Sequence, residues 1–165
     1  MLDLGPVTLR LRSDIPAVWG GLTRVYRDFP VLAPDRFADV SMELRHGAGV
    51  RRFVRKQAQL LVDDQPLFYP VALSLAPVLL EWGMNWVVAL REHEYLLVHA
   101  SAVEREGKAA LLPALPGSGK STLAGLLSMS GWRLLSDEFG MLELSSGKLR
   151  PFPRPFSLKG TSIAA

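Results

Sequence analysis

The sequence predicts an α/β protein in which a small α+β region, residues 1–70, precedes a larger core, residues 71–165. Three observations support this class. Residues 7–12 alternate apolar and polar, which is typical of a half-buried strand. Residues 71–90 form the most apolar stretch and are long enough for a buried helix. Residues 109–129 hold a short apolar run, a glycine-rich turn and then apolar residues at helical spacing, the strand–loop–helix order of α/β folds.

Composition sets the general class of the molecule. With 165 residues, 48% hydrophobic and 21% charged, the chain suits one soluble domain, or one domain with a small appendage. A net charge of +3 is too small to indicate nucleic acid. The absence of cysteine excludes disulfides, thiol catalysis and cysteine-ligated metal. No signal peptide is visible, and Pro77, Glu81 and Asn85 interrupt the apolar stretch, so we expect a cytoplasmic protein without a membrane partner.

The first region should contain several short elements. We expect a helix from Asp14 to about Tyr26, strands over 38–45 and 50–56, and a hairpin of 60–62 with 67–69. Asp63 and Asp64 would form the turn of that hairpin, where adjacent carboxylates are far more often turn residues than catalytic ones. The basic run Arg51-Arg-Phe-Val-Arg-Lys56 would lie along the second of these strands as a solvated face.

The core should alternate strands and helices. We expect a helix to about Arg91, strands over 95–103, 109–113 and 132–135, a helix from Lys120 to about Met129, and a hairpin of 139–144 with 148–150. The proline-punctuated tail reaches Ala165 without a closing signal, which is unusual for a phosphotransferase core. We therefore expect the core to be C-terminally short.

Ala114-Leu-Pro-Gly-Ser-Gly-Lys-Ser121 fits a phosphate-binding loop of the Walker A type. Gly117 and Gly119 lack a Cβ, so the backbone can turn sharply and direct its N–H groups into a concave nest. Lys120 can place a positive charge between the β- and γ-phosphates, and the Ser121 hydroxyl can reach Mg²⁺. A simple turn between a strand and a helix is the alternative. The nucleotide-binding residues would be Ala114, Pro116, Gly117, Ser118, Gly119, Lys120, Ser121 and Thr122, with ATP and Mg²⁺ as cofactors.

Asp137 and Glu138 follow the predicted strand 132–135. A carboxylate at a strand end beside a phosphate loop can bind Mg²⁺, and a second one can accept a proton from an attacking hydroxyl. The alternative is an acidic pair that begins a helix or a turn. His99 lies in an apolar strand and is either a satisfied core histidine or a residue that faces the acidic pair.

His99-Ala-Ser-Ala, the phosphate loop and Gly131-Trp-Arg-Leu-Leu-Ser-Asp-Glu138 together resemble the HPr kinase/phosphorylase family in type and spacing. The likeness covers about residues 95–145 and is greatest to the HPr kinase-related kinases, which are often encoded beside small peptide-binding proteins of the PqqD type. It implies a nucleotide-binding core like that of phosphoenolpyruvate carboxykinase and HPr kinase. It also implies ATP-dependent phosphorylation of a protein serine, on an HPr-like or PqqD-type partner, in an enzyme that tends to form homo-oligomers.

The resemblance also implies roles for single residues. Asp137 would be the general base, His99 would tune Asp137, Lys120 would hold the phosphates, and Ser121 and Glu138 would ligate Mg²⁺. The sequence departs from the family in having Glu138 for the usual Asp and Ala-Ser after the histidine. A later Glu-Val-Arg-Gly-like element is not found, and its place holds Arg154-Pro-Phe-Ser-Leu-Lys159, which offers phosphate contacts but no carboxylate. Two alternatives stay open, a non-catalytic ATP-binding sensor or scaffold and an ordinary P-loop NTPase that hydrolyses ATP or GTP.

Overall fold

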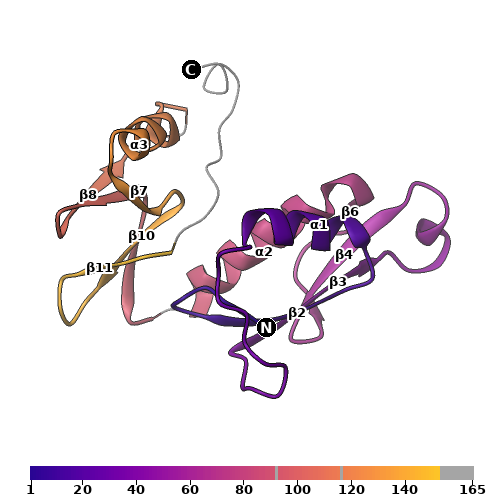
Figure 1. The fold of residues 1–165 in the computed structure, drawn as a ribbon. Coiled ribbons are helices and arrows are strands. Elements are labelled where there is room, and N and C mark those ends of the chain that lie inside the picture. The colour runs from indigo at the N-terminus through magenta and orange to yellow at the C-terminus, as the bar shows by residue number, and fades with distance from the viewer. Residues whose placement is uncertain (92, 116, 153–165) are drawn as a thin grey trace. The chain divides into compact units, whose positions relative to one another are not determined.

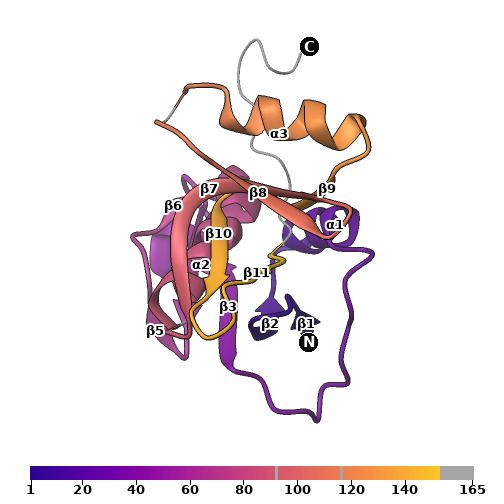
Figure 2. The same ribbon diagram turned by 90° about the vertical axis from the view of Figure 1, so that its left-hand side faces the viewer.

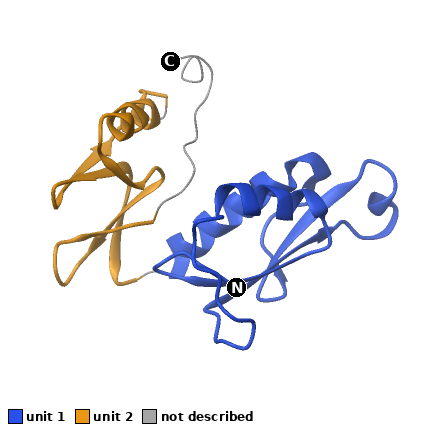
Figure 3. Cartoon of the chain, viewed as in Figure 1, with its two compact units in different colours: residues 1–91 blue, residues 92–165 orange. Residues whose placement is uncertain are grey.

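The computed structural model describes residues 1–91, 93–115 and 117–152, and it divides the chain into two compact units, Met1–Arg91 and Glu92–Ala165 (Figure 3). The sequence placed a boundary near residue 70. The division lies later because helix α2 (Ala76–Arg91) packs against α1 (Pro16–Val25) and β4 (Gln57–Val62) of the first unit. Its buried side chains belong to the core of that unit.

The first unit is a mixed sheet with two helices (Figure 1). Its strands run in the order β1-β2-β3-β4-β5, and β6 also pairs with β4. Strands β2 and β3 are parallel because α1 connects them, and the other pairings are antiparallel. The strands not yet bounded are β1 (Leu2–Asp3), β2 (Thr8–Ser13), β3 (Val40–His46), β5 (Gln65–Pro66) and β6 (Val71–Ala72).

The core of this unit forms where one face of the sheet meets the helices. Alternate residues of β3, Val40, Met42 and Leu44, are buried, as the period of a strand requires. Helix α2 lies very close to them. A Cβ on Gly83 would stand 2.7 Å from the Met42 Cε atom and 2.3 Å from the Leu60 Cδ2 atom, so only glycine fits this approach without displacement.

Most of the predicted elements of this unit are confirmed. The strand at 7–12, the first helix and the strand at 38–45 correspond to β2, α1 and β3. Asp63 and Asp64 form the two-residue turn between β4 and β5, with φ of 46° and 63°, as hairpin turns of this length require. The second strand of that hairpin is Gln65–Pro66 rather than 67–69.

The predicted strand over 50–56 is wrong. Gly49–Arg52 form a 3₁₀ turn (η1) in a loop, and β4 begins only at Gln57. Ala58, Leu60 and Leu61 of β4 are buried, whereas Val50 and Phe53 are exposed. The more continuously apolar segment therefore occupies the place beside β3, because it buries more apolar surface there.

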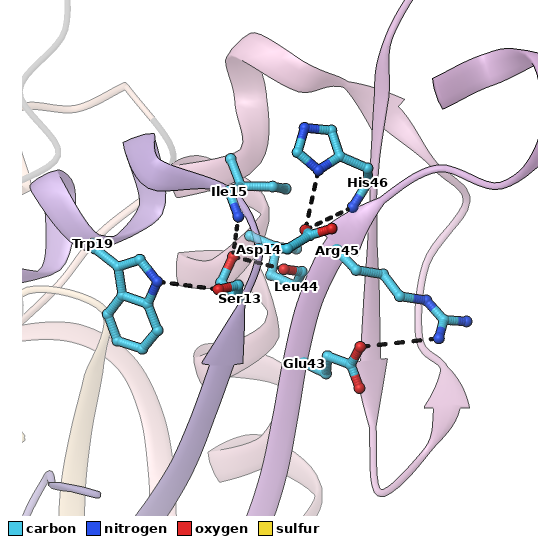
Figure 4. A network of polar contacts seen from close by, with 8 residues as sticks. All are labelled: Ser13, Asp14, Ile15, Trp19, Glu43, Leu44, Arg45 and His46. Atoms are coloured by element: carbon cyan, nitrogen blue, oxygen red, sulfur yellow. Dashed lines mark hydrogen bonds and ion pairs between the residues drawn. The ribbon is translucent and has the colours of Figure 1, made fainter. Parts of the chain in front are cut away.

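A polar cluster joins the start of α1 to the end of β3 (Figure 4). The Ser13 hydroxyl donates to the Leu44 carbonyl at 2.6 Å and accepts the Ile15 N–H at 3.1 Å. Asp14 Oδ1 accepts the His46 backbone N–H at 3.0 Å and lies 3.1 Å from His46 Nδ1. Burial alone would raise the pKa of Asp14, but the hydrogen bonds and charge of His46 lower this pKa below its usual value.

Helix α2 follows a short 3₁₀ turn, Leu73–Leu75. Among the described residues, one helical stretch, Leu73–Arg91, is long and apolar enough to cross a membrane by length and composition. Its inward side contributes Leu79, Met84 and Val88 to the core of the first unit. Core helices of globular proteins pass the same test, so this stretch is weak evidence for a membrane span.

The second unit is a sheet built around one long strand, β7 (Tyr95–Arg105). On one side β7 pairs with β8 (Lys108–Pro113), and on the other it pairs with β10 (Phe139–Glu143) and β9 (Arg133–Ser136) in succession. Strand β11 (Leu149–Arg150) completes the sheet beyond β10. Figure 2 shows helix α3 (Lys120–Met129) over β7, β8 and β9, which it contacts.

The predicted elements of this unit are confirmed in type and order. The strands and the hairpin correspond to β7 to β11, and the helix after the glycine loop begins at Lys120. All described pairings here are antiparallel, including the one that holds the strand before the loop. Residues 153–165, which include the predicted phosphate contacts Arg154 and Lys159, lie outside the described residues.

Candidate phosphate-binding site

The glycine loop connects β8 to the first turn of α3. Gly117 and Gly119 have φ of 82° and 90°, in the left-handed region that favours glycine. Gly119 is the N-cap of α3, and its carbonyl accepts the Leu123 N–H at 2.9 Å, which starts the helix. The sequence therefore predicted both the turn and the point where the helix begins.

The predicted nucleotide-binding residues that the structure describes lie between the end of β8 and the first turn of α3. The Ser118 hydroxyl donates to the Leu115 carbonyl at 2.7 Å, and the Ser118 N–H donates to the same oxygen at 3.2 Å, so the loop folds back on itself. Pro116 lies outside the described residues. Ala114, Gly117, Ser118 and Gly119 are exposed, while Lys120, Ser121 and Thr122 are half-buried in the first turn of α3. The loop and the positive end of the helix dipole are thus accessible to an anion.

The acidic pair forms the short connection between β9 and β10. The Ser136 hydroxyl accepts the backbone N–H of Phe139 at 3.2 Å and of Glu138 at 3.4 Å, which fixes the bend. Both flanking strands pair with β7: Ser136 is opposite Ala102 and Phe139 is opposite His99. The two carboxylates must therefore lie beside residues 99–102 of β7.

Asp137 meets Ser101 in the interior of the unit. The Ser101 hydroxyl donates to Asp137 Oδ1 at 2.6 Å, within the range of hydrogen bonds to a charged oxygen. Asp137 is 4% exposed and Ser101 is fully buried. Sequence reasoning missed Ser101, although it stands two residues after His99 and therefore on the same face of the strand.

His99 lies between Lys120 and Glu138. Its Nε2 atom is 2.8 Å from Lys120 Nζ, and its Nδ1 atom is 3.7 Å from Glu138 Oε1. A lysine ammonium group has donors only, so we assign Nε2 as the acceptor and the proton to Nδ1, on the side of the Glu138 carboxylate. The helix that carries the loop lysine and the turn that carries the acidic pair thus meet at one imidazole ring.

That His99 acts on Asp137 stays a prediction, and these contacts add Lys120 and Glu138 as partners of the ring. The ring contacts the second acid and the loop lysine, while Ser101 binds the first acid. The register explains why the two side chains of β7 have different partners. His99 is opposite Phe139, which follows Glu138 in the chain. Ser136 is opposite Ala102, so Asp137, the next residue, lies near Ser101. Each side chain of β7 meets the acidic residue nearest to it in the ladder.

The donor set suits a magnesium ion that is shared with phosphates. Among residues 1–91, 93–115 and 117–152, no group of three His, Cys, Asp or Glu side chains could hold a metal by itself. Mg²⁺ in nucleotide sites takes one or two protein oxygens and completes its shell with phosphates and water. Ser121 and Glu138 could supply such oxygens. Ser121 follows Lys120 in the chain, and Glu138 contacts the same His99 ring that Lys120 contacts.

No family model, curated protein or solved structure matches the chain.

Proposed function

We propose that this chain binds ATP with Mg²⁺ and transfers the γ-phosphoryl group to a serine of a protein substrate, in the manner of an HPr-kinase-like enzyme. The observation that carries the proposal is the His99 contact. It joins the lysine of a glycine-rich phosphate loop to a turn that presents two carboxylates. Phosphoryl transfer requires little besides such positioning and charge, because the protein forms no covalent bond with the phosphate.

Each group would have a defined task. Lys120 would leave His99 and bind the phosphates, which are stronger partners for an ammonium than a neutral imidazole. The Mg²⁺ ion, held by Ser121 and Glu138, would neutralise phosphate charge. The substrate serine oxygen would form a bond to the γ-phosphorus as the bond to the leaving ADP oxygen breaks, and Asp137 would take the serine proton.

The sheet supports this proposal over an ordinary P-loop NTPase. In doubly wound nucleotide-binding folds the strand before the glycine loop lies among parallel strands. Here β8 pairs with β7 in the antiparallel sense, and every described pairing of the unit is antiparallel. One observation favours a second candidate, an ATP-binding sensor without phosphotransfer: Asp137 is only 4% exposed, which restricts access of a protein hydroxyl.

Calorimetric titration with Mg²⁺ and ATP tests nucleotide binding. We expect Lys120→Ala to weaken the affinity for ATP by about ten- to a hundredfold, because this is the contribution of one hydrogen bond to a charged group. Lys148→Ala is the matched control, because Lys148 is exposed in the β10–β11 turn of the same unit. Equal affinities of the two variants would refute the phosphate-loop assignment.

Transfer is tested with γ-labelled ATP and two acceptors, an HPr-type protein and a PqqD-type protein. Asp137→Asn should bind ATP within about twofold of the unmodified chain, because the substitution removes the base and not a phosphate contact. It should abolish labelling of serine. ATP binding without labelled serine on either acceptor would favour the sensor. ATP hydrolysis at the same rate with or without an acceptor would favour the NTPase.

A further inference from the structure

The loop that connects β3 to β4 has a composition unlike the rest of the first unit. Residues 47–56, which we call the basic–apolar loop, read Gly-Ala-Gly-Val-Arg-Arg-Phe-Val-Arg-Lys. They include cationic and large apolar side chains and no acidic residue. Along a strand these side chains would divide between two faces, but here they lie in the loop that joins β3 to β4.

Hydrogen bonds at its base and within it shape the loop. The Gly47 N–H donates to the Gln57 carbonyl at 2.7 Å and closes the base. The Val50 carbonyl accepts the N–H groups of Phe53 at 3.0 Å and Val54 at 2.9 Å, which makes a compact turn. The Lys56 carbonyl accepts the Leu73 N–H at 3.0 Å, so the returning strand is tied to the segment before α2. The base is anchored to the body of the first unit.

The apolar side chains of this turn are exposed. Val50 is 73% exposed, Phe53 76% and Val54 60%. The cations beside them, Arg51, Arg52, Arg55 and Lys56, are also exposed. None of the ion pairs among the described residues involves these four cations. The loop therefore presents positive charge and a small apolar tip in the same ten residues.

The chemistry of the tip identifies its partner. Anionic lipid headgroups bind arginine and lysine, and the adjoining acyl chains accept apolar side chains. Nucleic acid matches the cations, but valine side chains neither stack on bases nor form hydrogen bonds with their edges. A stable protein interface needs on the order of 1,000 Å² of buried surface, far more than three side chains supply. Of these partners, a lipid surface is the one that binds both the cationic and the apolar side chains of the loop.

We propose that the basic–apolar loop docks the first unit on an anionic lipid surface. Val50, Phe53 and Val54 enter the boundary between headgroups and acyl chains, and the four cations bind lipid phosphates. Each cation should contribute about fivefold to the partition constant. The proposal is independent of the proposed kinase function, since no residue of the phosphate loop takes part.

Co-sedimentation of the full chain with vesicles tests the docking. We expect binding to vesicles of phosphatidylcholine that contain phosphatidylserine, and much weaker binding to phosphatidylcholine alone. Arg52→Gln should weaken binding about fivefold, whereas the control Arg24→Gln, an exposed arginine on α1, should leave it unchanged. Equal binding to both vesicle types, or equal effects of the two substitutions, would overturn the proposal.

Insertion of the tip is tested with a label, because the chain contains no cysteine. An environment-sensitive fluorophore on Phe53→Cys should shift to the blue on anionic vesicles and become shielded from aqueous iodide. The control is Phe37→Cys, since Phe37 is 83% exposed in another loop of the same unit and should show neither change. A label at position 53 that stays open to iodide on bound protein would overturn insertion. Binding of a short poly(U) RNA without binding of vesicles would overturn the proposal in favour of nucleic acid.

Discussion

Replacement of Ser101 by alanine tests the inner part of the candidate site. The substitution removes one hydroxyl oxygen and leaves the backbone of β7 unchanged. In the folded protein this hydroxyl donates to Asp137 Oδ1 at 2.6 Å, and both residues are buried. We expect Ser101→Ala to destabilise the second unit and to loosen the position of the Asp137 carboxylate.

The size of the effect follows from burial and charge. A hydrogen bond to a charged group contributes about 1.5–3 kcal/mol when its loss leaves the partner away from water. The Ser101–Asp137 bond has the short length of a charge-assisted bond, so we expect a loss of about 2 kcal/mol in the unfolding free energy. For amides that exchange through unfolding of this unit, 2 kcal/mol corresponds to about 30-fold faster exchange.

Hydrogen exchange followed by mass spectrometry resolves the two units, which a single melting curve need not do. Peptides from β7 and β9 should exchange faster in Ser101→Ala, and peptides from residues 1–91 should not change. Ser130→Ala is the control, because the exposed Ser130 hydroxyl donates to the Leu126 carbonyl at the end of α3, and its loss should stay within about 0.5 kcal/mol. Equal exchange in the two variants would refute the buried Ser101–Asp137 bond.

Further predictions concern the first unit. Gly83→Ala should lower the unfolding free energy of the first unit by about 1 kcal/mol, because overpacking against Leu60 outweighs the gain in helix propensity. Gly20 has open space around it, so Gly20→Ala should raise the same free energy by up to about 1 kcal/mol. Urea denaturation measures both changes. Asp14→Ala should destabilise by about 0.5–1 kcal/mol at neutral pH, since the carboxylate is half-exposed and loses the bonds from His46. The folded-state pKa of Asp14 lies below the unfolded value of 3.8, so this difference should be present above pH 3.8 and vanish as the pH falls through the folded-state pKa. A difference in unfolding free energy between Asp14→Ala and the unmodified chain that persists in full below that pH range would contradict the Asp14–His46 contact. A stabilising effect of Gly83→Ala would contradict the close packing of Gly83 against Leu60.

Local sequence determined the glycine loop and many of the elements around it. Gly117 and Gly119 adopt the positive φ that their lack of a Cβ permits, and α3 begins where the apolar spacing after Lys120 begins. The hairpin at the end of the described chain was predictable for the same reason, since its turn residues and alternation are close in sequence. Such features depend on a few neighbouring residues and need no knowledge of the sheet.

Only tertiary structure decided which segments pair and in what register. The exposed loop of residues 47–56 and the buried strand that follows it both contain large apolar residues, and the choice between them depends on what the distant β3 and α2 can bury. In the candidate site, the pairing of His99 with Phe139 and of Ala102 with Ser136 placed His99 on Glu138 and Ser101 on Asp137. Residue types and spacing indicated that these groups belong to one site. The ladder of β7 with β9 and β10 assigned each partner, because a shift of one residue would turn every side chain of the strand to the opposite face.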